Sequence, residues 1–283
     1  MNGSKTILIT GCSSGIGFQA ANILKKEGWQ VFATVRKEAD KLLLEEQGLR
    51  VIVMDLNDTH SIVKGVEQVL AQTGGNLYAL CNNAGFGQVG AIEDVSRNAL
   101  RAQFETNVFG LQELTNLIVP VMRRQGYGRI IHISSMLGLV TMAYRGAYCA
   151  SKYALESLAD ALRLELKGTG IFVSLIEPGP IQSEFRNNAK TIYAQNIPIT
   201  ESAHQGNYHS LMQNRAEAKK DSLFTLPPEA VVKKIQHALQ SKRPRIRYKI
   251  TFPAHFLAFL KRLLPDSWME WVLYRIMKNE VKS

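Results

Sequence analysis

Short apolar runs alternate along the chain with longer segments whose apolar residues recur every three or four positions. The runs at 6–10, 31–35, 51–54, 77–81, 129–133 and 171–176 predict buried strands. Helical spacing predicts helices at about 15–27, around 62–70, at 100–118 and at 148–167. Strands that are apolar along their whole length are typical of a parallel sheet covered on both faces. With right-handed crossovers, we expect a doubly wound α/β sheet of the Rossmann type.

The regular alternation stops after Pro178. Residues 184–227 are long and weakly periodic, which is usual for a functional loop, so we expect a substrate loop or lid there. A helix at about 228–240 and a short strand-like run at 245–248 follow. We therefore predict one domain over 1–283, with a cofactor-binding and catalytic core (4–183), a substrate-loop region (184–227) and a C-terminal helical extension (228–283).

Composition narrows the class of protein. Cys12, Cys81 and Cys149 have no metal-ligand spacing, so we expect reduced thiols, no metal site and a cytoplasmic protein. The N-terminus lacks the features of a secretory signal, and no run approaches the roughly 20 apolar residues that span a bilayer. These features predict a soluble protein.

Charge is unevenly distributed. The net charge is +10, and residues 230–265 hold nine lysines or arginines and no acid. Such a segment can attract phosphate groups of nucleic acid, lipid or cofactor, or it can be a solvated surface, and the charge alone leaves both open.

A glycine-rich turn lies between the first strand and the first helix, at residues 10–17. Glycines let the backbone approach a pyrophosphate, and the helix N-terminus offers unpaired N–H groups. In dinucleotide-binding folds an acid at the end of the second strand binds the ribose of NAD. Here Arg36 stands at that place, and the next acid is Glu38. Arginine suits a phosphate, so the sequence predicts NADP(H), with NAD(H) as the less favoured cofactor.

Tyr148 and Lys152 are separated by four residues in a predicted helix, which puts them on one face. A phenol has a pKa of about 10 and is a poor base at neutral pH. An ammonium at roughly 4 Å would be worth about 4 kcal/mol at an effective dielectric near 20, or about three pKa units. We therefore expect the lysine to bring the tyrosine near neutrality as an acid and base.

With these motifs in this order, residues 4–183 resemble the short-chain dehydrogenase/reductase family. The resemblance rests on the glycine turn at 10–17, Asn82-Asn83-Ala84-Gly85, the Tyr148–Lys152 pair and Pro178-Gly179. It implies a catalytic tetrad of Asn107, Ser135, Tyr148 and Lys152. It also implies cofactor contacts from Gly11, Ser13, Ser14, Gly15, Ile16, Gly17, Arg36, Asp55, Asn83, Ala84, Gly85, Tyr148, Lys152, Pro178, Gly179, Ile181 and Ser183.

The resemblance also implies individual roles. Ser135 would hydrogen-bond the substrate oxygen, and Tyr148 would exchange a proton with it. Lys152 would bind the nicotinamide ribose and lower the pKa of the tyrosine, and Asn107 would hold a water. His132 and Cys149 are expected to pack beside the site rather than react.

No motif names the substrate. Apolar and aromatic residues over 252–274 fit a hydrophobic aldehyde, ketone, steroid or retinoid, but they could equally only pack the terminal helices. The segment is expected mainly as internal cover of a pocket or a subunit interface in a homo-oligomer, with contact with a membrane surface as the alternative. An inactive dinucleotide-binding sensor is the other alternative, and binding of nucleic acid is not expected.

Overall fold

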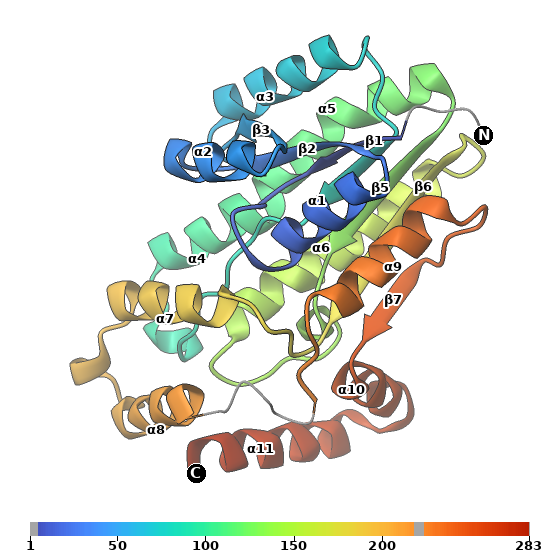
Figure 1. Ribbon diagram of the computed structural model, residues 1–283. Coiled ribbons are helices and arrows are strands. Elements are labelled where there is room, and N and C mark those ends of the chain that lie inside the picture. The colour runs from blue at the N-terminus through green and yellow to red at the C-terminus, as the bar shows by residue number, and fades with distance from the viewer. Residues whose placement is uncertain (1–4, 218–223, 283) are drawn as a thin grey trace.

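The computed structural model describes residues 5–217 and 224–282, and its centre is a parallel β-sheet. The strand order is β3-β2-β1-β4-β5-β6-β7, and all neighbours are parallel (Figure 1). The strands are β1 (Thr6–Ile9), β2 (Gln30–Val35), β3 (Arg50–Val53), β4 (Ala79–Asn82), β5 (Gly128–Ile133), β6 (Ile171–Pro178) and β7 (Arg247–Ile250). The predicted doubly wound fold is confirmed.

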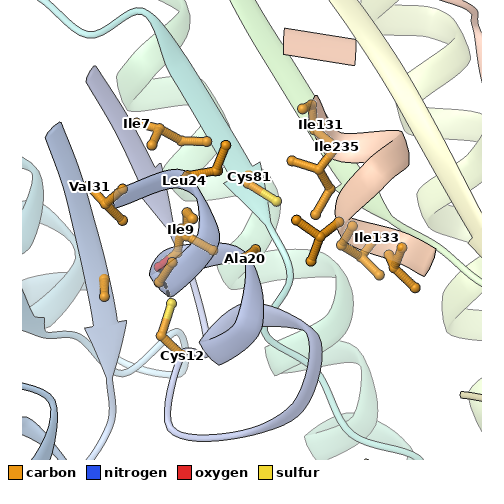
Figure 2. Close-up of a cluster of buried hydrophobic side chains, with 14 of the residues drawn as sticks. Ile7, Ile9, Cys12, Ala20, Leu24, Val31, Cys81, Ile131, Ile133 and Ile235 are labelled. Carbon is orange, nitrogen blue, oxygen red and sulfur yellow. Dashed lines mark hydrogen bonds between the residues drawn. The ribbon is translucent and has the colours of Figure 1, made fainter. Parts of the chain in front are cut away.

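Alternate residues of each strand point into two apolar layers. Ile7 and Ile9 of β1 face a cluster formed with helices α1 (Gly15–Lys26) and α9 (Glu229–Gln240). Leu8 between them faces the opposite cluster, with helices α3 (Thr59–Gln72), α5 (Gly110–Gln125) and α6 (Gly146–Glu165). Figure 2 shows the first layer, in which side chains of α1 and α9 meet those of β1, β4 and β5. Burial on both faces explains why the strands read as continuous apolar runs.

The strand order reverses between β1 and β4. In open α/β sheets this switch point leaves a crevice at the carboxyl ends of the strands, where ligands bind. The segments that follow these ends are the glycine turn after β1, Asn83 after β4 and Ser135 after β5. The topology therefore places these predicted site residues together at the carboxyl ends of the strands.

The expected helix at 100–118 is divided. The structure has α4 (Arg97–Phe104), a π-helical turn η2 (Glu105–Phe109) and then α5. A π-turn adds a residue to the helical repeat and often occurs at functional sites. Here it carries the buried Asn107.

The region expected as a substrate loop is largely helical. It holds α7 (Phe185–Asn196), η4 (Ile199–Glu201) and α8 (Gln205–Glu217), and residues 218–223 lie outside the described part. Tyr193 and Tyr208 are buried against Val89 and Ala91, so tertiary packing stabilises a segment with weak periodicity.

The C-terminal part is not helical throughout. β7 joins the sheet beside β6, and only α10 (Phe252–Leu263) and α11 (Asp266–Lys282) form a helical end. Both lie beyond the carboxyl end of β7 (Figure 1). The remaining elements are α2 (Glu38–Glu46), η1 (Ile92–Asp94) and η3 (Met136–Gly138). Within the described residues, none of the helices is both long and apolar enough to cross a bilayer.

Candidate active site

The glycine turn is closely packed against the loop after β4. A Cβ on Gly11 would lie 2.8 Å from Ala84 Cα, and one on Gly17 would lie 2.3 Å from the Gly11 carbonyl oxygen. Gly11 and Gly15 also have positive φ values of +70° and +60°, which side-chain-bearing residues rarely adopt. The turn therefore requires glycine for both its conformation and its contacts. It presents backbone at the N-terminus of α1, which fits a pyrophosphate.

Asn83 holds this turn from the neighbouring strand. Its amide nitrogen donates to the carbonyl oxygens of Thr10 (2.9 Å) and Gly11 (3.0 Å). The backbone N–H groups of Asn83 and Ala84 donate to the Thr10 hydroxyl at 3.0 and 2.9 Å. The amide nitrogen of Asn83, expected as a cofactor contact, thus fixes the shape of the turn.

The end of β2 is tied to the same turn. The Gly11 N–H donates to the Thr34 hydroxyl at 3.3 Å, and the Cys12 N–H donates to the Thr34 carbonyl at 2.8 Å. Arg36 follows two residues later and is exposed. Asp55, after β3, accepts a hydrogen bond at its side chain from the Asn57 N–H at 3.0 Å. The region beside the turn thus carries an exposed guanidinium at the end of β2.

The segment after β6 reaches both the turn and β7. The Gly179 N–H donates to the Ile250 carbonyl at 3.0 Å, and Ile181 forms an isolated bridge with Leu226. A Cβ on Gly15 would lie 3.1 Å from Ser183 Cβ, so Ser183 borders the start of α1. Residues 178–183 therefore lie between the glycine turn and β7.

Tyr148, Ser135 and Lys152 meet at the carboxyl end of β5. α6 supplies Tyr148 and Lys152 from successive turns, and Ser135 follows β5 and hydrogen-bonds the tyrosine side chain. The Ser135 hydroxyl also accepts from the Leu137 N–H at 3.1 Å, which begins η3. The Lys152 ammonium donates to the Ile133 carbonyl at 2.8 Å and lies 5.8 Å from the centroid of the Tyr148 ring.

Asn107 is linked to the same helix. Its amide nitrogen donates to the Phe86 carbonyl (3.0 Å) and the Ser151 hydroxyl (3.1 Å), and the Ser151 hydroxyl donates to the Tyr148 carbonyl (2.8 Å). The Asn107 carbonyl oxygen accepts from the Phe86 N–H at 3.1 Å. The structure therefore brings all four residues of the predicted tetrad together. Asn107 braces the backbone of the loop after β4.

The ionisation of the tyrosine differs from the expectation. Burial raises the pKa of Tyr148 above its usual value, and the hydrogen bond from Ser135 only partly opposes this. Burial also lowers the pKa of Lys152 to about 8, against the attraction of Glu156. The expected lowering of the tyrosine pKa by an ammonium at contact distance is wrong. The physical reason is that the ammonium is held by Ile133 and desolvation of the phenol dominates.

Sequence reasoning missed a buried ionic cluster behind Lys152. Glu156 lies one turn further along α6, and Arg247 of β7 contacts it at 3.0 Å. Arg247 also contacts Glu177 of β6 at 3.1 Å and Asp160 at 2.7 Å. The four-residue spacing of Lys152 and Glu156 was visible in the sequence. Arg247, the partner of Glu156 on β7, is 91 residues away from it along the chain.

Phe185 was also missed. Its ring lies 5.5 Å from that of Tyr148, centroid to centroid, and it closes one side of the site from α7. On another side Cys149 packs with Leu257 of α10 and Met269 of α11, and Tyr148 packs against this cluster. The surroundings of the tyrosine are thus apolar.

His132 and Cys149 are both buried beside the site. His132 is buried and contacts the Asn82 amide at 3.2 Å, and burial with the nearby Lys152 lowers its pKa to about 3. Cys149 is buried, and burial raises the pKa of its thiol. All three cysteines are free, and the described residues contain no cluster that could hold a metal ion.

Residues 5–193 match the family model of the short chain dehydrogenases. The chain belongs to the short-chain dehydrogenase/reductase family. It is therefore an oxidoreductase of small molecules, with a nucleotide-binding fold.

Curated relatives cover nearly all of the chain. It is 42% identical over 269 residues to the uncharacterized oxidoreductase YbbO of Escherichia coli K12, covering 95% of this chain and 94% of the relative. It is 33% identical to the NADPH-dependent 3-dehydrocapnine reductase of Ornithobacterium rhinotracheale, with 96% and 97% covered. It is 36% identical to human retinol dehydrogenase 8, with 86% and 80% covered.

Proposed function

We propose that this protein interconverts an alcohol and a carbonyl group of a hydrophobic substrate with NADP(H), using Tyr148 as the proton donor and acceptor. The observation that carries the proposal is the cluster in which the buried Ser135 hydrogen-bonds the partly buried Tyr148, with the buried Lys152 one helical turn away. The nicotinamide ring, when bound, would supply the hydride.

The roles of the residues follow from their positions. The Tyr148 hydroxyl would give its proton to the substrate oxygen during reduction and take it back during oxidation. Ser135 would donate a hydrogen bond to that oxygen and orient it. Lys152 is anchored to the Ile133 carbonyl, so its charge stays beside the tyrosine, where it would bind the nicotinamide ribose.

The cofactor would lie across the crevice between β1 and β4. Gly11, Gly15 and Gly17 give the turn its close-packed shape, and Ser13, Ser14 and Ile16 would surround the pyrophosphate at the start of α1. Arg36 at the end of β2 supports NADP(H), because a guanidinium can pair with a 2′-phosphate. The NADPH dependence of the dehydrocapnine reductase supports the same choice.

The substrate would enter beside Phe185, Leu257 and Met269. These side chains form an apolar surround for Tyr148, which suits an aldehyde, ketone, steroid or retinoid. The similarity to retinol dehydrogenase 8 supports an apolar alcohol or aldehyde. A second candidate, an inactive dinucleotide sensor, has no supporting feature, because all four predicted catalytic residues are present and juxtaposed.

Turnover of a panel of aldehydes, ketosteroids and retinal with NADPH tests the proposal. We expect Tyr148→Phe to reduce turnover to below a few per cent and leave cofactor affinity nearly unchanged. A variant that keeps substantial turnover would exclude Tyr148 as the proton donor. Loss of cofactor binding would show instead that the tyrosine supports the fold of the site. The wild type failing to oxidise NADPH with any substrate, while still binding it, would favour the sensor.

A further inference from the structure

The two C-terminal helices present large apolar side chains to solvent. Along α10, Phe252, Phe256, Phe259 and Leu263 recur at helical spacing and are 45–62% exposed. Along α11, Trp268, Trp271 and Tyr274 are 51–65% exposed. We call this surface the aromatic face: Phe252, Phe256, Phe259, Leu263, Trp268, Trp271 and Tyr274.

Among the described residues, packing leaves most of this face exposed, although Phe252 stacks on Phe224 at 5.8 Å between ring centroids. The opposite side of the same helices already covers the active site, through Ala254 and Leu257 of α10 and Met269 of α11. α10 is therefore apolar on both sides. A helix that is apolar all round is normally buried, so the aromatic face has the composition of a covered surface. The expectation of internal cover thus applies to the inner side of these helices, and the part of the chain that the structure describes leaves their outer side largely uncovered.

Cations lie among the exposed aromatic rings. On α11 the Arg275 guanidinium lies 5.0 Å from the Trp271 ring centroid, whereas Lys261 near the end of α10 contacts the Tyr153 hydroxyl of α6 at 3.1 Å. The Lys278 ammonium similarly lies 5.5 Å from the Tyr274 ring. Two exposed acids, Asp266 and Glu270, also belong to α11. The segment leading into α10 adds to the basic balance, since residues 230–251 hold seven lysines or arginines and no acid, and among them Arg247 and Lys249 pair with Glu177.

The charges on this face distinguish between two possible partners, a second copy of the chain and a lipid surface. A second copy docked about a twofold axis would bring the same cations of both chains together, which costs energy. An anionic lipid surface is complementary to them, and it accepts tryptophan and tyrosine at the depth of its headgroups. Apolar side chains next to them can enter the acyl boundary.

We propose that the aromatic face docks on a lipid bilayer that carries anionic headgroups. α10 and α11 would lie in the membrane interface, with their inner sides on the active site. The entrance beside Tyr148 would then lie near the bilayer, where apolar molecules accumulate. The docking depends on this surface alone and not on the proposed substrate.

Tryptophan fluorescence gives a direct test. The chain has three tryptophans, and Trp29 is buried at 6% exposure, so a change on lipid binding would come from Trp268 and Trp271. With vesicles of phosphatidylglycerol and phosphatidylcholine we expect a blue shift of the emission and quenching by brominated acyl chains. Vesicles of phosphatidylcholine alone, or salt raised from about 0.05 to about 0.5 M, should weaken binding at least tenfold.

Paired variants identify the surface. Phe259→Ser with Trp268→Ser should reduce affinity for the anionic vesicles at least tenfold. Leu42→Ser with Leu43→Ser on α2 is the matched control, since these leucines are 59% and 57% exposed at the β3 edge of the sheet, and it should bind as the wild type does. Thermal unfolding confirms that each variant is folded. Equal vesicle binding by both pairs, or no quenching by brominated lipid, would overturn the proposal. So would a wild-type dimer, detected by sedimentation, that the Phe259/Trp268 pair dissociates.

Discussion

Replacement of Glu156 by glutamine tests whether the buried cluster tunes Lys152. The attraction of Glu156 opposes the burial that lowers the pKa of Lys152 to about 8. The two side chains lie one helical turn apart, about 6 Å between Cβ atoms. At an effective dielectric of about 20, such a pair is worth about 2–3 kcal/mol, or roughly two pKa units. Glu156→Gln should therefore bring the pKa of Lys152 to roughly 6–6.5.

The consequence is a pH-dependent loss of activity. The lysine loses its charge as pH rises through its pKa, so the alkaline limb of kcat/KM should move to lower pH. At pH 7.5 the protonated fraction would fall from about three quarters to below about one tenth, whereas near pH 6 it would fall only about twofold. Activity should follow these fractions.

Rate profiles from pH 5.5 to 9 with a soluble aldehyde check this prediction. Asp160→Asn is the matched control, because Asp160 also pairs with Arg247 but lies a further turn from Lys152. Its profile should stay close to that of the wild type. An alkaline limb that does not move in Glu156→Gln, or an equal loss at every pH, would refute the reasoning. The second result would indicate a structural role for Glu156 alone.

Three further predictions concern the cofactor, the stability and the substrate region. Arg36→Asp should reverse a preference for NADPH over NADH by more than tenfold in measured affinity, because charge-assisted bonds contribute roughly 1.5–3 kcal/mol each; equal wild-type affinities would exclude the assignment. Burial and the neighbouring Glu156 raise the pKa of Glu177 to about 7, so the folded protein keeps a proton that the unfolded chain releases above about pH 4.3, and stability falls as pH rises toward 7. In denaturant titrations between about pH 4 and 7, the free energy of unfolding of Glu177→Gln should fall by about 3 kcal/mol less than that of the wild type. An equal fall with pH in both proteins would contradict this prediction. Tyr208→Phe should lower the free energy of unfolding by about 2–4 kcal/mol, since the hydroxyl bonds the Ala91 N–H and the Asp94 carboxylate. Tyr193→Phe, whose buried hydroxyl has no hydrogen-bond partner among the described residues, should cost nothing in the same assay.

The parts of the fold with strong local patterns could be predicted from sequence. The β-rich apolar runs place six strands within one or two residues, since a strand buried on both faces leaves a clear signal. Residues 184–227 lacked such a signal, because α8 is held by the burial of Tyr208 rather than by a regular apolar stripe. The π-turn at Asn107 was equally hidden, because one added residue barely changes the apolar spacing of a long helix.

In the candidate site, too, residues in local patterns could be predicted from the sequence and contacts between distant segments could not. Tyr148 and Lys152 lie one turn apart on α6, so spacing placed them on one face, whereas Ser135 and Asn107 were predicted from the family resemblance. The contacts of Glu156 with Arg247 and of Phe185 with Tyr148 join distant segments, and no local pattern encodes them. The ionisation of Tyr148 depends on desolvation, which requires the packed structure.

The three buried cysteines allow local opening of the fold to be measured by alkylation of their thiols. Burial raises the pKa of Cys81 to about 12 and that of the Cys12 thiol further still, so neither presents a thiolate to an alkylating reagent while the fold is closed. Cys12 lies in the glycine turn, Cys81 in the central strand β4 and Cys149 beside the C-terminal helices. The rate at which each thiol is alkylated would therefore report separately on the opening of the nucleotide crevice, the sheet and the C-terminal helices, with no label added to the chain.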